Sequence, residues 1–83
     1  MDTTDTLHIK FDNNGLDDPD EAFFEEMAGM INDYLSYYQK VSNFRVDNKY
    51  IYCDFTHSDM WNNSQYVQGI ASGYLMAKGY EII

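Results

Sequence analysis

The sequence is poor in basic residues and in cysteine, and each shortage excludes a class of protein. Five Lys and Arg residues face fourteen Asp and Glu residues in a chain of 83, which gives a net charge of −9 at pH 7. An acidic surface repels phosphates, so the balance argues against direct binding of nucleic acid. The single cysteine, Cys53, excludes an intrachain disulfide. Its place among strand-forming residues predicts a buried, unreactive side chain.

Long apolar runs are also missing. No stretch approaches the roughly 20 residues of a membrane-spanning helix. The start of the chain, from Met1 to Asp5, is acidic where a signal peptide would be basic. We therefore expect a cytoplasmic protein without a membrane partner. The length suits one domain over residues 1–83, and the aromatic content of 17% supplies the large side chains that a small core needs.

The charge is unevenly distributed along the chain. Ten of the fourteen acidic residues lie in residues 1–33 and are opposed there only by Lys10. This segment therefore carries the whole net charge of −9, and residues 34–83 are neutral. Such an asymmetry predicts attraction to a basic partner surface.

Apolar residues alternate with polar ones in the segments that we predict to be strands. Thr6–Asp12 has this pattern and ends in a turn at Asn13-Asn14-Gly15. Two further strands, over Phe44–Val46 and Lys49–Thr56, are expected to be joined by a two-residue turn at Asp47-Asn48. The tail, Tyr80–Ile83, can add a last strand.

Two helices are predicted between these strands. Asp18, Pro19 and Glu21 match the N-cap, N1 and N3 positions of a capping box, and the apolar spacing that follows predicts a helix over Pro19–Lys40. The second helix contains Val67 to Leu75 and ends at Lys78-Gly79. Its start is open, because three residues can cap it: Ser58, Asn62 and Asn63.

The order of elements is β-α-β-β-α-β, which predicts a ferredoxin-like α+β fold with a four-stranded antiparallel sheet and two helices on one face. An arrangement with the tail unpaired is the alternative. The periodicity predicts that six strand residues face the helices: Leu7, Ile9, Phe11, Ile51, Cys53 and Phe55. Six helix residues are expected opposite them: Phe23, Met27, Ile31, Leu35, Ile70 and Tyr74.

Catalytic and metal-binding signatures are weak. His57 and Asp59 lack the spacing of zinc ligands. Asp12-Asn13-Asn14-Gly15 departs from a calcium loop, because Leu16 stands at the fifth position. No nucleophile elbow or phosphate-binding loop is present, so we expect no enzyme activity, no metal and no cofactor.

Two other features predict contacts. The open face of the sheet should carry five polar or aromatic residues, and a tyrosine-bearing face of this kind favours a protein neighbour: His8, Lys10, Tyr50, Tyr52 and Asp54. Gly69, Gly73 and Ala77 form a small-residue stripe, which predicts close packing against the first helix, near Gly29, or against a second copy.

The densest charge lies at the start of the first predicted helix. Six acids occur there within ten residues, more than capping requires: Asp17, Asp18, Asp20, Glu21, Glu25 and Glu26. Helical rise predicts that Asp18, Glu21 and Glu25 lie about 4–6 Å apart along one edge, which is comparable to the spacing of about 3.4 Å between phosphates along one nucleic-acid strand. We expect these six residues to contact basic residues of a partner, with apolar contacts added by Tyr37 and Trp61.

In size, acidity and this helical cluster from Asp17 to Glu26, the chain resembles the DNA-mimic inhibitors of bacteriophages. The resemblance implies an inhibitor that acts in the host cytoplasm and occupies the nucleic-acid site of a basic host protein, such as a nucleoid protein, a restriction enzyme, a DNA-repair glycosylase or a CRISPR effector. The alternative is a protein–protein interaction module, which could be homodimeric through Tyr50, Tyr52 or the Gly69–Gly73 helix, and whose acidity serves solubility.

Overall fold

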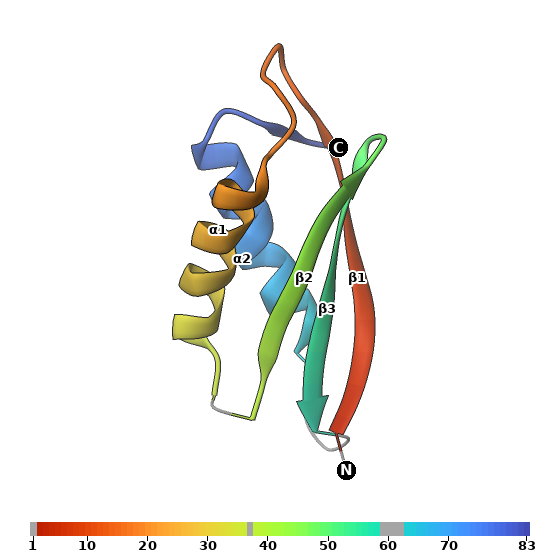
Figure 1. Cartoon of the computed structure of the whole chain (residues 1–83), viewed down its shortest axis with the longest axis vertical. Coiled ribbons are helices and arrows are strands. Elements are labelled where there is room, and N and C mark those ends of the chain that lie inside the picture. The colour runs from red at the N-terminus through yellow and green to blue at the C-terminus, as the bar shows by residue number, and fades with distance from the viewer. Residues whose placement is uncertain (1, 37, 59–62) are drawn as a thin grey trace.

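The computed structural model describes residues 2–36, 38–58 and 63–83. Its elements follow in the predicted order: β1 (Asp2–Asp12), α1 (Glu21–Tyr34), β2 (Lys40–Asp47), β3 (Tyr50–Ser58), α2 (Ser64–Ala77) and β4 (Glu81–Ile82). The sheet has the order β2-β3-β1-β4, and each neighbouring pair is antiparallel. Both helices cover the same face of the sheet (Figure 1). The α+β prediction is confirmed, and the arrangement is consistent with a ferredoxin-like fold.

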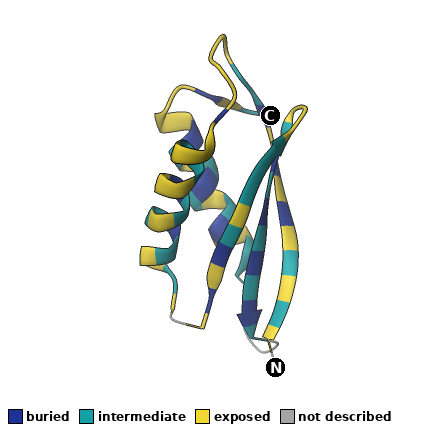
Figure 2. Cartoon of the chain, in the orientation of Figure 1, coloured by how far each residue is buried: buried dark blue, intermediate teal, exposed yellow. Residues whose placement is uncertain are grey.

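The hydrophobic core lies between this sheet face and the helices. β1 pairs with β3 so that Leu7 is opposite Cys53 and Ile9 is opposite Ile51. Because side chains alternate along a strand, all six strand residues predicted to face the helices point the same way and are buried (Figure 2). Of the predicted helix residues, Met27 and Ile31 are fully buried, and the other four are partly buried against the core. The core also takes in Val41, Val67, Ala71, Leu75 and Tyr80.

A bulge in β2 brings more of this strand to the core than its sequence indicates. The pairing of β2 with β3 is regular at Ser42 and at Arg45, and the register shifts between them, where Asn43 has a φ of 55°. The extra residue changes the alternation, so that Val41 before the bulge and Phe44 after it both face the helices. The strand is therefore Lys40–Asp47 rather than the predicted Phe44–Val46.

Helix α1 begins two residues later than predicted. Asp20 is the N-cap, and its carboxylate accepts a hydrogen bond of 2.9 Å from the backbone N–H of Phe23. The predicted cap, Asp18, instead accepts a bond of 2.6 Å from the side chain of Asn13. The capping box is thus wrong, because Asn13 holds Asp18 in the preceding connection and Glu21 becomes the first helical residue.

The same helix ends at Tyr34 rather than at Lys40. The side chain of Asn32 accepts from the N–H of Val41 at 2.9 Å and donates to its carbonyl at 3.1 Å. This pair of bonds satisfies the backbone at the start of β2, as a neighbouring strand would. The residues after Tyr34 therefore leave the helix axis and turn toward β2.

The second helix stops as predicted. Gly79 has a φ of 102°, and its N–H bonds to the carbonyl of Met76, while the N–H of Tyr80 bonds to that of Leu75. These bonds form a Schellman motif. Residue Asn63 precedes the helix without a side-chain cap, Ser58 belongs to β3, and Asn62 lies outside the described residues. Among the described residues, no helix has the length and apolar character that crossing a bilayer requires.

Three strand boundaries also differ from the predictions. β1 extends back to Asp2, and β3 extends to Ser58. The hairpin closes between Asp47 and Tyr50, so its turn residues are Asn48 and Lys49 rather than Asp47 and Asn48. Asn48 has a φ of 56°, which suits an asparagine in a tight turn. The tail does pair, since Ile82 of β4 lies opposite Phe11 of β1.

The glycine stripe of α2 does not pack against any element in the described part of the chain. A Cβ atom placed on Gly69, Gly73 or Gly29 meets nothing within 4 Å, and all three residues are exposed. The prediction that the stripe packs against α1 is therefore wrong. The face of α2 toward the sheet is formed by Val67, Ala71 and Leu75, and the glycines lie on other sides of the helix.

These open glycines generate a stability prediction. Gly69→Ala and Gly73→Ala should each raise the free energy of unfolding by about 0.5–1 kcal/mol, because alanine lowers the backbone entropy of the unfolded chain and meets no neighbour. Urea titration followed by circular dichroism measures the change. Gly79→Ala is the control and should destabilise, because its φ is positive and Leu16 lies 3.1 Å from the added Cβ. A loss of stability in the first two variants would show that the stripe packs against a second copy.

Candidate protein-binding site

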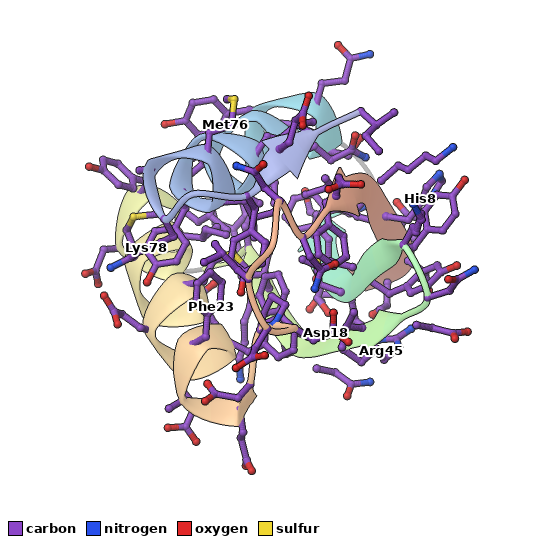
Figure 3. All side chains as sticks on the ribbon, turned by 90° about the horizontal axis from the view of Figure 1, so that it is seen from above. His8, Asp18, Phe23, Arg45, Met76 and Lys78 are labelled. Carbon is purple, nitrogen blue, oxygen red and sulfur yellow. The ribbon has the colours of Figure 1, made fainter. Side chains whose placement is uncertain are left out.

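The six predicted acidic residues form one exposed surface, which we call the acidic segment: Asp17, Asp18, Asp20, Glu21, Glu25 and Glu26. The segment runs from the connection after β1 into the first two turns of α1. Figure 3 looks onto this end of the molecule, with Asp18 on the connection and Phe23 on the helix beside it. The structure thus brings the six residues together in one region.

The connection that carries the first of these acids is held by its own side chains. Asn14 and Gly15 have φ values of 52° and 83°, and the N–H of Leu16 closes the predicted turn on the carbonyl of Asn13 at 2.8 Å. The side chain of Asn13 donates to the carbonyl of Leu16 at 3.1 Å, as well as to Asp18. A single asparagine therefore fixes the turn and the acid five residues later.

The C-terminal part of the chain holds the same connection from the other side. The side chain of Asn14 donates to the carbonyl of Gly79 at 3.2 Å. The hydroxyl of Tyr80 donates a short hydrogen bond to the carbonyl of Asp17, and Tyr80 itself is buried against Phe11 and Phe23. The start of the acidic segment is thereby anchored to the core.

The carboxylates of the segment fall into two groups. Three have partners: Asp18 binds Asn13, Asp20 caps α1, and Glu26 lies 3.7 Å from Lys78. Among the described residues, no hydrogen bond or ion pair reaches the carboxylates of Asp17, Glu21 or Glu25. These three are therefore available to a partner without the loss of an intramolecular contact.

The chain's cations leave the segment largely unneutralised. Arg45 pairs with Asp54 at 3.2 Å, and Lys49 lies 3.7 Å from Asp12. Within the described part of the chain, Lys78 is the cation that forms an ion pair with the segment. Burial of Tyr80, and then the nearby charges of Asp18, Asp17 and Asp20, raise the pKa of its hydroxyl. The negative potential of the segment thus extends to a neighbouring buried group.

Two grooves flank the segment. The larger, of about 480 Å³, lies between the start of α1 and the bulge of β2. Phe24 and Phe44 line it, stacked at 5.9 Å with an angle of 17° between their rings, beside Asp20, Glu21 and Glu25. The smaller, of about 350 Å³, lies between the connection and the end of α2 and is lined by Leu16, Phe23 and Tyr80 with three acids. The acidic segment is therefore a ridge between two partly apolar hollows.

The larger groove contains residues that sequence reasoning missed. Phe44 reaches α1 only because of the bulge at Asn43, and a bulge leaves no pattern in a single sequence beyond an asparagine that tolerates positive φ. Phe24 follows Phe23 directly, outside the apolar stripe that was used to predict the helix. The sequence signal for this groove is Phe24 itself, an aromatic residue that lies outside the apolar stripe at the start of an acidic helix.

The open face of the sheet carries the residues predicted for it. The ring of His8 lies 5.8 Å from that of Tyr50 and 6.3 Å from that of Tyr52. Arg45 joins them, with its guanidinium 5.8 Å from the centre of the Tyr52 ring. Bonds to Asn43 and Arg45 lower the pKa of Asp54, so its charge is already matched within this face. The aromatic rings and the charged groups of this face therefore contact one another.

His57 and Cys53 point toward the helices. Both ring nitrogens of His57 have oxygen neighbours, Asp5 at 2.7 Å and the carbonyl of Ser58 at 2.8 Å. Burial raises the pKa of the Cys53 thiol to about 11, which makes it a poor nucleophile. The described residues contain no group of three or more His, Cys, Asp or Glu that could hold a metal ion. Asp59, Tyr37 and Trp61 lie outside them.

Comparison of the chain with models of known protein families, with curated proteins and with solved structures gives no match. The site is therefore interpreted from its own geometry and charge.

The difference between acids with partners and acids without them generates a prediction about stability. Asp20→Ala should lower the free energy of unfolding by about 1 kcal/mol, because it removes the N-cap of α1. Glu21→Gln should change it by less than about 0.5 kcal/mol, because Glu21 is exposed and makes no contact that the variant would break. Urea unfolding curves of the two variants provide the comparison. Equal losses would mean that the whole segment is structural.

A second prediction concerns Tyr74, whose buried hydroxyl has no hydrogen-bond partner of good geometry among the described residues. Burial, followed by the neighbouring Glu26 carboxylate, raises the pKa of Tyr74 from 10.0 to about 12. The unfolded chain releases this proton at lower pH, so the contribution to stability is complete below about pH 10 and is lost as the pH rises toward 12.

The urea midpoint of the wild-type chain should therefore fall more steeply above about pH 10 than that of Tyr74→Phe, which has no proton to release there. Lysine titration occurs in both proteins and provides the common background. Parallel pH profiles of the two proteins would contradict the raised pKa.

Proposed function

We propose that this protein is an inhibitor that mimics nucleic acid and occupies the nucleic-acid-binding site of a basic host protein. The acidic segment is the contact surface. Asp17, Glu21 and Glu25 bind cationic side chains that otherwise contact phosphates, and the three remaining acids add to the field. Nucleoid proteins, restriction enzymes, DNA-repair glycosylases and CRISPR effectors all have sites of this chemistry.

The observation that carries the proposal is the exposure of six carboxylates on a braced ridge. Like charges repel one another, so a dense cluster lowers the stability of the fold. That cost favours a functional role for the cluster. Here the turn, the N-cap and the Tyr80 hydrogen bond hold the backbone of the ridge in place. Carboxylates on a fixed backbone lose less conformational entropy on binding than those on a flexible loop, which favours a binding role over a solubility role.

The larger groove supports a protein partner in particular. Phe24 and Phe44 offer aromatic surface directly beside Glu21 and Glu25. An arginine side chain can stack its guanidinium on an aromatic ring while it pairs with a carboxylate. Arginine is abundant in phosphate-binding sites, so the groove is suited to the side chains that such a site presents.

A second candidate function is a protein–protein interaction module whose acidity serves solubility. A groove of about 380 Å³ between α1 and α2 favours it. Met30, Ile70 and the open Gly73 line this groove, and Tyr34 and Tyr66 stand exposed beside them. An apolar hollow without charge would bind an apolar element of a partner or of a second copy, and its binding would depend little on salt.

The proposed function is tested by a charge-matched pair of variants. Asp17→Asn/Glu21→Gln/Glu25→Gln removes the three carboxylates without partners. Three exposed ion pairs contribute about 0.2–1 kcal/mol each, so affinity for the partner should fall roughly 3- to 150-fold at low salt, and the salt dependence should flatten. The partner is captured from bacterial lysate at low salt and released by a salt step, and its affinity is then measured with purified proteins.

The control variant is Asp33→Asn/Asp47→Asn/Glu81→Gln, which changes the net charge equally at exposed positions outside the segment. It should bind as the wild type does. Competition with DNA decides between the two functions, because a mimic and DNA must exclude each other on the same partner. Simultaneous binding of both, or equal weakening by the two triple variants, would contradict the proposed function and favour the interaction module.

A further inference from the structure

Most of β1 has no strand on its outer side. β1 is 11 residues long and is paired with β3 from Asp2 to Lys10 without a break in register. On its other side, β4 covers only Phe11 and Asp12, with one further bond from the N–H of Ile83 to the carbonyl of Lys10. Within the described residues, no strand pairs with the outer side of β1 before Lys10. Figure 1 shows β1 at the margin of the sheet over this length.

The hydrogen bonds show which residues face this open edge. The N–H of Phe11 points to β3, where it bonds to Lys49, whereas the carbonyl of Lys10 points to β4. In an antiparallel sheet, the N–H and C=O of one residue point to the same side, and the side alternates along the strand. The backbone groups of Thr4, Thr6 and His8 therefore point outward from the open edge.

This edge lacks the features that keep exposed strands from pairing. The opposite edge, β2, is interrupted by the bulge at Asn43 and carries Lys40, Arg45 and Asp47. Between Thr4 and Ile9, β1 has no proline, lysine or bulge, and its one carboxylate, Asp5, is directed to the helix face, where it lies 2.7 Å from Nε2 of His57. Bulges and charges are the usual protection of an edge strand. An unprotected edge of this length is a surface for strand addition.

We propose that the open edge of β1 binds a second copy of this chain, with the two β1 strands antiparallel and Thr6 on the two-fold axis. Thr6 then lies opposite Thr6 of the partner subunit, and Thr4 lies opposite His8 of the partner subunit. The two sheets become one continuous sheet through pairing of residues 3–9. The interface is isologous, since the same strand contributes on both sides.

Charge and length select this register over its neighbours. An axis through Asp5 would place two like carboxylates directly opposite each other, which is destabilising in a sheet. An axis through Leu7 would restrict pairing to residues 5–9, because β4 occupies the edge from Lys10 onward. The axis through Thr6 avoids both effects, since Asp5 then faces an uncharged leucine.

The distribution of charge around this edge favours the approach of a second copy. α2, the helix that packs on β1, contains no charged residue. α1, with Glu21, Glu25 and Glu26, packs toward β2, and Asp17 and Asp18 lie beyond the Asp12 end of β1 beside Tyr80, away from Thr4–His8. Two chains of net charge −9 can therefore approach through β1 with their densest charge kept apart. The pairing does not rest on the proposed function and would serve either candidate.

Disulfide trapping tests the register. At the proposed axis the two Cα atoms of residue 6 lie about 5.5 Å apart, within the range of a disulfide. The two copies of residue 4 lie four residues apart in register, about 14 Å. Under mild oxidation, Thr6→Cys should form a covalent dimer and Thr4→Cys, equally exposed on the same strand, should not. The wild-type chain controls for the buried Cys53. Equal crosslinking of both variants, or of neither, would overturn the proposal.

Sedimentation tests the dimer itself. The wild-type chain should sediment as a dimer that dissociates on dilution, and Thr6→Pro should lose dimerisation while its circular dichroism spectrum is unchanged. Proline at this position removes an N–H that points outward and leaves the bonds to β3 intact. A wild-type chain that stays monomeric at every concentration, or a folded Thr6→Pro chain that still dimerises, would show the proposal to be wrong. The cysteine pair decides the outcome even where the proline variant fails to fold.

Discussion

From Asp2 to Lys10, β1 and β3 are paired without a break, and the other elements take their positions from this pair. The register places Leu7, Ile9 and Phe11 on the same face as Ile51, Cys53 and Phe55. A shift of one strand by one residue would move its apolar set to the solvent face while the set of the other strand stayed on the core face. Each of the five Leu, Ile and Phe side chains in these sets contributes about 1.5–3 kcal/mol through burial, so the register is strongly specified. The helices cover the face that this pairing makes apolar.

The acidic segment imposes a second constraint, since mutual repulsion of its carboxylates opposes folding. The fold offsets this repulsion mainly with groups that carry no charge. Asn13, the N–H of Phe23 and the Tyr80 hydroxyl hold the backbone and two of the acids, and Lys78 is the one cation of the described chain paired within the segment. Neutral donors fix the geometry without cancelling the charge. This arrangement preserves a negative surface that lysine or arginine would neutralise.

Features set by periodicity could be predicted from the sequence, because they depend on many residues at once. The face of β1 and β3, the α2 stop at Gly79 and the order of elements are of this kind. Features set by one local competition could not. Asp18 and Asp20 both suit an N-cap, and only the distant partner Asn13 decides between them. Asn32 ends α1 through a bond to Val41 in the next strand. The Phe24–Phe44 groove depends on a bulge that no pattern indicates.

In the acidic segment too, the composition is visible in the sequence, whereas the contacts of the side chains are not. Six acids in ten residues are visible in the sequence, and all six are exposed. The sequence does not show that three are engaged within the chain and three are not, because that depends on where Lys78, Asn13 and the helix start lie. For the glycine stripe, the sequence predicts a contact that the described part of the structure does not contain. Its spacing predicts a contact, but spacing alone does not determine which side of the helix faces the sheet.

The two proposed surfaces lie on different sides of the fold, and this separation has a consequence for affinity. The acidic segment runs from the connection after Asp12 into α1, which packs toward β2, whereas the open edge is the Thr4–His8 part of β1. A dimer through β1 would present two acidic segments, one from each outer flank. When a partner has two basic sites within reach, the second contact becomes intramolecular and the apparent affinity rises without a new type of interaction. Weak, salt-sensitive ion pairs gain most from such linkage, because each is individually worth little in water. Pairing through β1 would therefore strengthen the proposed electrostatic contact without enlarging the acidic segment.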